Sequence, residues 1–389
     1  MPENKNKLLK MEATLLDWTQ IYAAVFIVAL GFSLLLTPLC RIIARKTGFL
    51  DVPKCENHKL HKNATPLLGG AAMYGAWILT VAAGFLAAKF LLPGTSGEAK
   101  LSSDLQGIHF VATDFTVICI CAFAAVILGL IDDKYPLKAS TKFAGQLVIA
   151  VVTALFSHTK ISLFVGVPGF SFVITVMWFL FIFNSINFFD NMDGLAAGTA
   201  AIAFSFFTAA AIWNEQYFVA TLGASLAGSV IGFWFFNHSP ASIFMGDSGS
   251  HFLGYMLAVI SAKTTYYTPD VSAFQMNILI PIFILAVPIF DTIAVMVIRI
   301  LNGKPVYVGD HNHISHRFHH MGMTRKRAVL LVHILGIISG LGAMPLLWGD
   351  RKSCILLLIQ GLAILLLLTL LQHFGKGTDP ELSGKENNK

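Results

Sequence analysis

Long apolar runs follow one another so closely in this chain that they leave no room for a soluble domain. Hydrophobic residues make up 56% of the 389 residues and charged residues 12%, against about 25% charged residues in soluble domains. A helix that crosses a bilayer needs about 20 mostly apolar residues. We therefore predict an all-α, polytopic integral membrane protein with about eleven transmembrane helices. The predicted spans lie near residues 19–42, 68–92, 110–131, 143–158, 170–186, 194–213, 217–236, 250–263, 276–300, 327–348 and 353–374.

The spans form one continuous unit with a polar segment on either side. We predict a polar N-terminal tail over residues 1–18, a single integral membrane domain over 19–374 and a polar C-terminal tail over 375–389. Because the first segment is polar, we expect no cleaved signal peptide. The five cysteines show no metal-site spacing and indicate no disulfide scaffold.

Lysine and arginine residues are concentrated in alternate loops between the predicted spans. Loops with an excess of these residues face the cytoplasm. This rule predicts an N-terminus outside and a C-terminus in the cytoplasm, although Lys5, Lys7 and Lys10 in the N-terminal tail argue weakly against it. We interpret the formal net charge of +6 as a sign of membrane topology, and we expect no nucleic-acid partner.

Asp132 and Asp133 are adjacent carboxylates where the apolar run 115–131 meets a basic stretch that includes Lys134 and Lys142. A charge inside hydrocarbon costs about 2.5–3.5 kcal/mol, and a second like charge is worse unless a cation or the interface receives it. Mg²⁺ prefers carboxylate oxygens together with substrate phosphate oxygens. The pair therefore indicates phosphate chemistry at the membrane surface. The alternative is a pair of ordinary charges at a helix end.

Two further polar clusters follow the fifth and seventh spans on the same predicted face. Asn187, Asp190 and Asp193 are spaced to share roughly one side of a helix, or they could only cap the sixth span. Asp247 lies in a glycine-containing segment that could be a plain turn. The same glycines would equally let backbone amides approach a phosphate.

Two loops and one buried carboxylate complete the set of candidates. The loop over residues 58–70 carries lysines, and the loop over 309–320 is rich in histidine and could bind a diphosphate or be merely solvated. With so many carboxylates nearby, a hard metal held by oxygen is favoured over zinc. Asp291 lies inside the ninth span, which makes it a functional candidate by default. A buried partner such as Arg299 would instead satisfy it structurally.

Five motifs in this order resemble those of the polyprenyl-phosphate N-acetylhexosamine-1-phosphate transferases, glycosyltransferase family 4. The resemblance extends from about Arg41 to Met323. The motifs lie at His61–Gly70, Asp132–Gln146, Asn187–Gly194, Phe244–Gly249 and the histidine loop.

The resemblance implies an enzyme of the bacterial inner membrane with a cytoplasmic active site. It implies transfer of a HexNAc-1-phosphate, in the first place GlcNAc-1-phosphate, from a UDP-sugar to undecaprenyl or another polyprenyl phosphate, with release of UMP. This reaction is the first membrane step of a cell-envelope glycan. The implied cofactor is Mg²⁺, with Mn²⁺ as a substitute. Oligomeric state stays open, including a homodimer.

The resemblance also implies roles for single residues. Asp132 and Asp133 match the acidic pair, one of which activates the lipid phosphate, and Asp247 matches the Mg²⁺ ligand. The remaining matches are to substrate-binding positions: Lys59, Lys62, Thr65 and Lys142 for phosphate, Asn187, Asp190 and Asp193 near the nucleotide and metal, Asn237 for the nucleotide sugar, and His313 and His316 for the sugar and diphosphate.

Ser315 departs from the family pattern, in which related GlcNAc-1-phosphate transferases commonly have a histidine at this place. The three consecutive histidines typical of phospho-N-acetylmuramoyl-pentapeptide transferases are also absent, so that reaction is the alternative rather than the first choice. An ion-coupled transporter would place its carboxylates near the membrane midplane, whereas here they cluster at one face. A non-catalytic lipid-binding homologue would be expected to lack one of the motifs.

Overall fold

The computed structural model describes residues 2–52, 64–91, 108–157, 159–161, 167, 169–264, 278–303, 305, 312–348 and 351–374. Within these ranges the regular structure is helical apart from one pair of two-residue strands. Eight of the described helices are long and apolar enough to cross a membrane, judged by length and composition. The predicted fold class, an all-α polytopic membrane protein, is thereby confirmed.

Each segment predicted as a span contains a helix. The helix α1 begins at Pro2, so most of the predicted polar tail is also helical. The elements are α1 (Pro2–Thr47), β1 (Leu50–Asp51), β2 (Thr65–Pro66), α2 (Gly69–Leu91), α4 (Ile108–Lys134), α5 (Ala139–Phe156), α6 (Phe170–Phe189), α7 (Leu195–Trp213), α8 (Tyr217–Asn237), α9 (Gly246–Lys263), α10 (Ile280–Ile284), α11 (Ala286–Leu301), α12 (Ile314–His320), α13 (Arg325–Ala343), the 3₁₀ turn η2 (Met344–Leu347) and α14 (Arg351–Phe374).

The ninth predicted span is not one helix but two, α10 and α11, which meet at Leu285. Proline has no amide hydrogen to donate, so it is best tolerated in the first turn of a helix, where the donors have no intrahelical partner. Pro281 is the second residue of α10 and Pro288 the third residue of α11. The break therefore places both prolines in a first turn.

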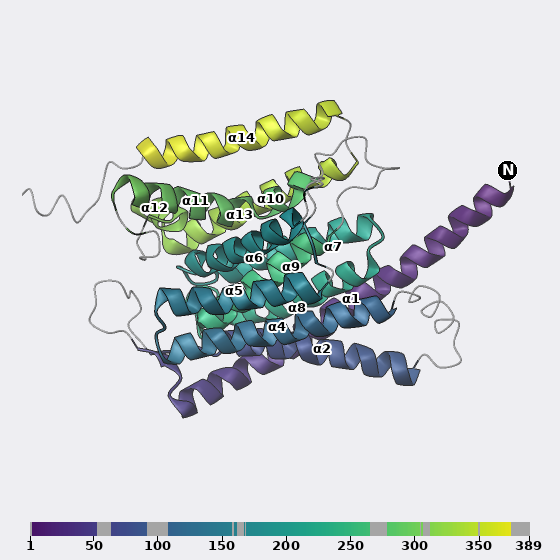
Figure 1. The fold of residues 1–389 in the computed structure, drawn as a ribbon, viewed down its shortest axis with the longest axis horizontal. Coiled ribbons are helices and arrows are strands. Elements are labelled where there is room, and N and C mark those ends of the chain that lie inside the picture. Colours follow the sequence, from purple (N-terminus) through teal and green to yellow (C-terminus); the bar gives the residue numbers. More distant parts are fainter. Residues whose placement is uncertain are drawn as a thin grey trace, which may run out of the picture.

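The helix α9 lies at the centre of the bundle (Figure 1). Every residue from Ser248 to Ser261 is buried, and α9 packs mainly against α4 and α6. Its first turns contain Gly, Ser and His rather than large apolar residues. Small residues let helix backbones approach closely inside a membrane bundle. This composition suits a helix surrounded by protein rather than by lipid.

The loop before α2 is fastened to the segment before α9. The strands β1 and β2 pair antiparallel, with Asp51 opposite Thr65. The carbonyl of Pro66 accepts the Phe244 N–H at 2.8 Å, and the Gly69 N–H donates to the Phe244 carbonyl at 3.1 Å. The strand pair, the connection from α4 to α5 and α12 all lie at the left-hand end of the bundle in Figure 1.

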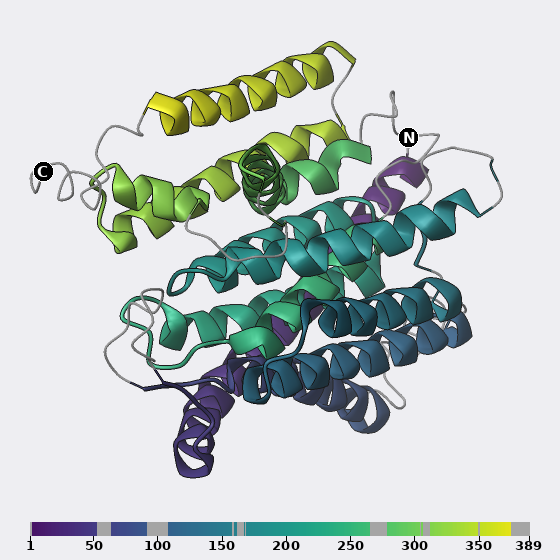
Figure 2. The same ribbon diagram turned by 60° about the vertical axis from the view of Figure 1, so that its left-hand side comes forward.

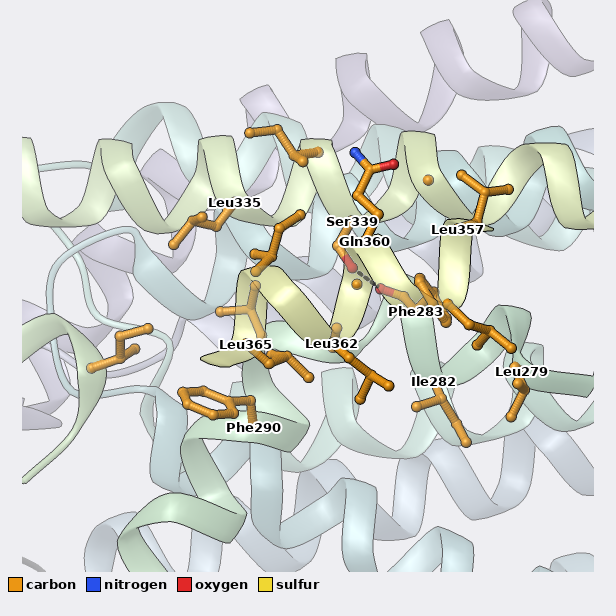
Figure 3. A pocket seen from close by; sticks show the side chains of 18 residues that line it. Leu279, Ile282, Phe283, Phe290, Leu335, Ser339, Leu357, Gln360, Leu362 and Leu365 are labelled. Carbon is orange, nitrogen blue, oxygen red and sulfur yellow. Dashed lines mark hydrogen bonds between the residues drawn. The ribbon is translucent and has the colours of Figure 1, made fainter. Parts of the chain in front are cut away.

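The helix α14 lies along the outside of the bundle, at the top of Figures 1 and 2. Together with α13, α10 and α11 it encloses a cavity of about 310 Å³. The lining is almost entirely apolar and includes Phe283, Phe290 and Leu362 (Figure 3). Ile314, at the start of α12, also lines this cavity.

Candidate active site

Lys142 on α5 joins three other helices at one point. Its Nζ lies 2.9 Å from Asp132 Oδ2 on α4, 3.0 Å from Asp247 Oδ1 on α9 and 3.3 Å from Asn187 Oδ1 on α6. The Asn187 amide also donates to Asp247 Oδ1 and to Ser250 Oγ. The Lys142 side chain is only 18% exposed, so its charge is balanced by these neighbours rather than by solvent. Three separately predicted motifs therefore meet at one ammonium group.

Asp133 binds the first turn of α9. Its Oδ1 accepts the Asp247 N–H at 2.7 Å and its Oδ2 accepts the Ser248 N–H at 3.1 Å. The first amides of a helix have no intrahelical acceptor, and the positive end of the helix dipole favours a carboxylate there. Asp133 therefore fixes the backbone of Asp247, the residue expected to bind the metal.

Asp132, its neighbour, faces a different set of partners. Its Oδ1 accepts the Leu137 N–H at 2.7 Å, which closes the turn between α4 and α5, while its Oδ2 pairs with Lys142. The residue is 8% exposed. Adjacent residues on a helix point about 100° apart, and this divergence sends one carboxylate to α9 and the other to α5.

Two glycines allow the backbones around Asp247 to come this close. A Cβ on Gly129 of α4 would lie 2.3 Å from the Ser248 nitrogen, closer than real Cβ contacts. Gly246 has φ +67°, and a Cβ there would lie 2.5 Å from Asp133 Oδ2. A positive φ is tolerated by glycine at no steric cost. Larger residues at these positions would displace Asp247.

Asp190 and Asp193 lie in the connection between α6 and α7. Burial raises the pKa of the Asp190 carboxyl to about 8, and the nearby negative charges of Asp247, Asp133 and Asp193 add to the increase. Asp193 Oδ2 accepts the Ala241 N–H at 3.0 Å, which ties this connection to the segment before α9. The carboxylates thus stand close enough to repel one another.

Asn237, at the end of α8, uses its amide to hold two backbone segments. Its Oδ1 accepts the Gly194 N–H at 3.1 Å, and its Nδ2 donates to the Ile243 carbonyl at 3.0 Å. The residue is buried. The structure therefore shows Asn237 supporting the loop that carries Asp193, a role not predicted from the sequence.

The histidine loop enters the bundle through α12. His313 Nδ1 lies 2.7 Å from Asp291 Oδ2, and both residues are buried. Ser315 Oγ donates to Asn191 Oδ1 at 2.6 Å. His316 is also buried, with its ring centroid 6.5 Å from that of His313. Because Asn191 directly follows Asp190, these contacts bring the histidines to the carboxylate cluster.

His251, which the sequence analysis did not select, supports Asp247 from inside the bundle. Its Nδ1 lies 2.5 Å from the Asp247 carbonyl and its Nε2 lies 3.1 Å from Gln146 Nε2. Gln146 Oε1 accepts an N–H of Asn184 at 2.9 Å, which leaves the Gln146 amide nitrogen as a donor to His251. The available signal was a histidine one helical turn after Asp247.

The remaining predicted residues are placed only in part. Thr65 lies in β2 and is buried. Lys59 and Lys62 lie outside the residues that the structure describes. In the sequence, they belong to the same loop as Thr65.

A hard divalent cation fits the donors around Asp247. Its side chain is 30% exposed, and the negative charges of Asp247, Asp133 and Asp193 add to the effect of burial in raising the pKa of Asp190. Among the described residues, no group of three or more His, Cys, Asp or Glu side chains is arranged to hold a metal by itself. Mg²⁺ commonly takes one or two carboxylates and leaves its other positions to water and substrate phosphate. Asp247, with Asp190 or Asp193 nearby, would hold such an ion.

Comparison with known proteins gives concordant matches. A family model described as glycosyl transferase family 4 matches residues 115–265. A probable undecaprenyl-phosphate N-acetylglucosaminyl 1-phosphate transferase of Bacillus subtilis (strain 168) is 35% identical over 328 residues, which are 82% of this chain and 84% of the relative. A decaprenyl-phosphate N-acetylglucosaminephosphotransferase of Mycobacterium leprae is 31% identical, with 82% of each chain covered. A phospho-N-acetylmuramoyl-pentapeptide-transferase of Bacillus cytotoxicus is 31% identical over 60% of this chain and 72% of the relative.

Proposed function

Because the chain belongs to glycosyl transferase family 4, we propose that it transfers N-acetylglucosamine-1-phosphate from a UDP-sugar to a polyprenyl phosphate and releases UMP. The meeting of Asp132, Asn187 and Asp247 at Lys142 carries this proposal. The relatives named for this reaction match over four fifths of the chain, whereas the pentapeptide transferase matches over 60% of it. The smaller coverage makes the pentapeptide reaction the weaker candidate.

The reaction joins two phosphates that repel each other. A phosphate monoester has a second pKa near 6, so the lipid phosphate is largely a dianion at pH 7. One of its oxygens attacks the phosphorus that carries the sugar, and the bond from that phosphorus to the UMP oxygen breaks. In this proposal Lys142 binds the attacking phosphate, and its charge lowers the repulsion between the substrates.

The carboxylates have separate tasks in this proposal. Asp132 orients the acceptor or takes up its remaining proton beside Lys142. Asp133 holds the start of α9, and Asp247 binds Mg²⁺ together with Asp190 or Asp193. When bound, Mg²⁺ supplies positive charge for the donor diphosphate. His313 and His316 bind the sugar and diphosphate, and Asn187 positions Asp247.

The apolar chain of the acceptor requires a place in the membrane near the reacting phosphate. The cavity between α10, α11, α13 and α14 offers one, because its lining is apolar and includes Ile314, which directly follows His313. We assign the isoprenoid chain of the acceptor to this cavity. The isoprenoid chain would then contact Ile314 of the histidine loop.

We further propose eleven membrane crossings in a bacterial inner membrane, with the N-terminus outside and the active site and C-terminus in the cytoplasm. Lysine and arginine residues gather in the loops beside the candidate site, as expected of cytoplasmic loops. UDP-sugars are cytoplasmic compounds, so the same orientation supplies the donor. Cysteines introduced at Ala139 and Ala241 should react with an impermeant thiol reagent only from the cytoplasmic side. Labelling of either from outside would contradict this topology.

The experiment for the reaction uses membranes that contain the protein, undecaprenyl phosphate and UDP-GlcNAc labelled in the sugar. We expect a butanol-extractable labelled lipid together with an equal amount of UMP. Lys142→Met should lower the rate by about 10²–10³-fold, the scale for loss of a group that stabilises developing charge. Lys138→Met is the matched control, because Lys138 lies four residues earlier and is exposed. Labelled lipid without UMP, or equal rates in both variants, would refute the proposal.

A further inference from the structure

Asp291 is a carboxylate in an apolar helix, and it is 1% exposed. Such a group is costly to bury unless it is paired and hydrogen-bonded. Both of its oxygens contact the start of the histidine loop. Oδ2 lies 2.7 Å from His313 Nδ1, and Oδ1 accepts the Ile314 N–H at 2.6 Å.

These contacts determine which nitrogen of the His313 ring carries a proton. A carboxylate can only accept hydrogen bonds, so His313 Nδ1 must be the donor. The ring nitrogen left for a substrate is then Nε2. When both ring nitrogens carry a proton, Nε2–H can donate to an anionic oxygen while Nδ1–H donates to Asp291.

A second contact holds the same segment against the carboxylate cluster. Ser315 Oγ donates to Asn191 Oδ1 at 2.6 Å, and Asn191 follows Asp190 in the chain. Arg299, which the sequence analysis offered as the partner of Asp291, lies over the ring of Phe188 at 5.4 Å. The segment that carries His313 is thus held from α11 on one side and from the α6–α7 connection on the other.

We propose that Asp291 is a positioning residue, which holds His313 with Nδ1 protonated and presents its Nε2 to the diphosphate of the donor. The identity of this ligand rests on the proposed function. A purely structural role, in which Asp291 only caps α12, is the competing explanation. The two explanations can be separated because Oδ2 contacts the His313 ring, whereas Oδ1 accepts the Ile314 N–H of α12.

Asp291→Asn separates them with almost no change in volume. The amide oxygen of asparagine accepts hydrogen bonds, so it can still accept the Ile314 N–H. Its NH₂ group then faces His313 Nδ1, which must become an acceptor, and the ring can no longer carry a charge in this orientation. The substitution therefore keeps the hydrogen bond to the Ile314 N–H but changes His313 Nδ1 from a donor into an acceptor.

The test is a double-mutant cycle of Asp291→Asn and His313→Gln, read as kcat and KM for UDP-GlcNAc. Asp291→Asn alone should lower kcat/KM by about 10–100-fold, the usual effect of losing a group that orients a ligand, mainly through KM. In the His313→Gln background the same change should cost less than about twofold, because coupled residues are not additive. Equal losses in both backgrounds would overturn the proposal.

Thr292→Val is the matched control for a buried polar change on the same helix. Thr292 Oγ1 donates to Ser185 Oγ at 2.9 Å and has no part in the histidine contact. We expect it to lower the thermal unfolding midpoint in detergent without a change in KM for the donor. A change in KM like that of Asp291→Asn would show a general loosening of α11 and would count against the proposal.

Binding measurements keep this test independent of turnover. With Mg²⁺ present, UDP should raise the unfolding midpoint of the wild type more than UMP does, because UDP has the second phosphate. Asp291→Asn should reduce the UDP effect and leave the UMP effect unchanged. If both proteins gave these shifts in unfolding midpoint but the wild type made no lipid product, the proposed reaction would fail while this inference stood. If UDP and UMP had equal effects on the wild type, the inference would fail.

Discussion

The carboxylate of Asp133 accepts the backbone N–H of Asp247 at 2.7 Å. Asp133 therefore contacts the start of α9, where it sets the position of Asp247, the expected metal ligand. Its neighbour Asp132 contacts Lys142 instead. Two residues that look equivalent in the sequence are thus expected to fail in different ways when they are changed.

Asp133→Asn should impair metal binding. One amide oxygen can accept one N–H of α9, but the NH₂ group then faces the other N–H, so the start of the helix must shift. We expect a loss of about 10–100-fold in rate and a higher Mg²⁺ concentration for half-maximal activity. Asp132→Asn should cost about 10²–10⁴-fold with an unchanged Mg²⁺ requirement. The measurement is the activity of both variants as a function of Mg²⁺ concentration. Identical curves would disprove that Asp133 acts on metal binding and Asp132 does not.

Asp247→Asn should abolish transfer at any Mg²⁺ concentration, because it removes the carboxylate expected to bind the ion. If Asp190 or Asp193 supports the metal site without contacting the ion directly, more Mg²⁺ should partly restore the activity of Asp190→Asn or Asp193→Asn. EDTA should silence the wild type, and Mg²⁺ or Mn²⁺ should restore it. Full activity of the wild type in EDTA would remove the basis for a metal at Asp247.

The raised pKa of Asp190 predicts a pH-dependent stability. In the folded protein without a cation, the Asp190 carboxyl has a pKa of about 8, compared with the ordinary value of 3.8 for an exposed aspartate. The contribution of Asp190 to the free energy of unfolding is therefore complete at pH below 3.8 and is lost as pH rises to about 8. Unfolding midpoints in EDTA should show this fall in the wild type but a smaller one in Asp190→Asn. Mg²⁺ should reduce the difference in pH dependence between the wild type and Asp190→Asn. Its binding near pH 7 should release protons from the protein. Parallel pH curves for the two proteins in EDTA would contradict the assignment.

Gly342→Phe should fill the apolar cavity. Gly342 lines it, and a Cβ at this position would meet nothing within 4 Å. We expect KM for undecaprenyl phosphate to rise at least about tenfold, on the scale of steric exclusion from an apolar pocket, with KM for UDP-GlcNAc unchanged. Leu341→Phe is the control, because Leu341 is adjacent on α13 and 59% exposed. An acceptor with a very short chain should not distinguish the two variants. Normal use of the long acceptor by Gly342→Phe would place the lipid elsewhere.

Hydropathy predicted where the helices lie but not how they are joined. The break at Leu285 was missed because Pro281 and Pro288 are equally compatible with one continuous membrane helix whose backbone is satisfied by neighbours. The motif residues Asp132, Asn187 and Asp247 were predicted to lie at one face. Their meeting at a single lysine depends on the packing of α4, α5, α6 and α9, which periodicity does not encode.

The contacts of individual side chains were the hardest part to predict. Asp133 differs from Asp132 only by its direction from the helix, and that direction has meaning only once α9 is in place. The pairing of Asp291 with His313 depends on the chain folding back after α11, whereas Arg299 was the nearer partner in sequence. His251 gave little signal because a histidine in an apolar helix is compatible with many environments.

The central position of α9 also constrains how the protein is made. Its first turns contain Gly, Asp, Ser and His, and it is not among the eight described helices that are long and apolar enough to cross a membrane by length and composition. During biosynthesis α4 and α6 leave the ribosome before it and supply the surfaces on which it packs. Asp133 of α4 is therefore synthesised before Asp247, whose amide it accepts in the folded protein. A chain that stops before α9 therefore contains Asp132 and Asn187, two of the contacts of Lys142, but lacks Asp247, the third.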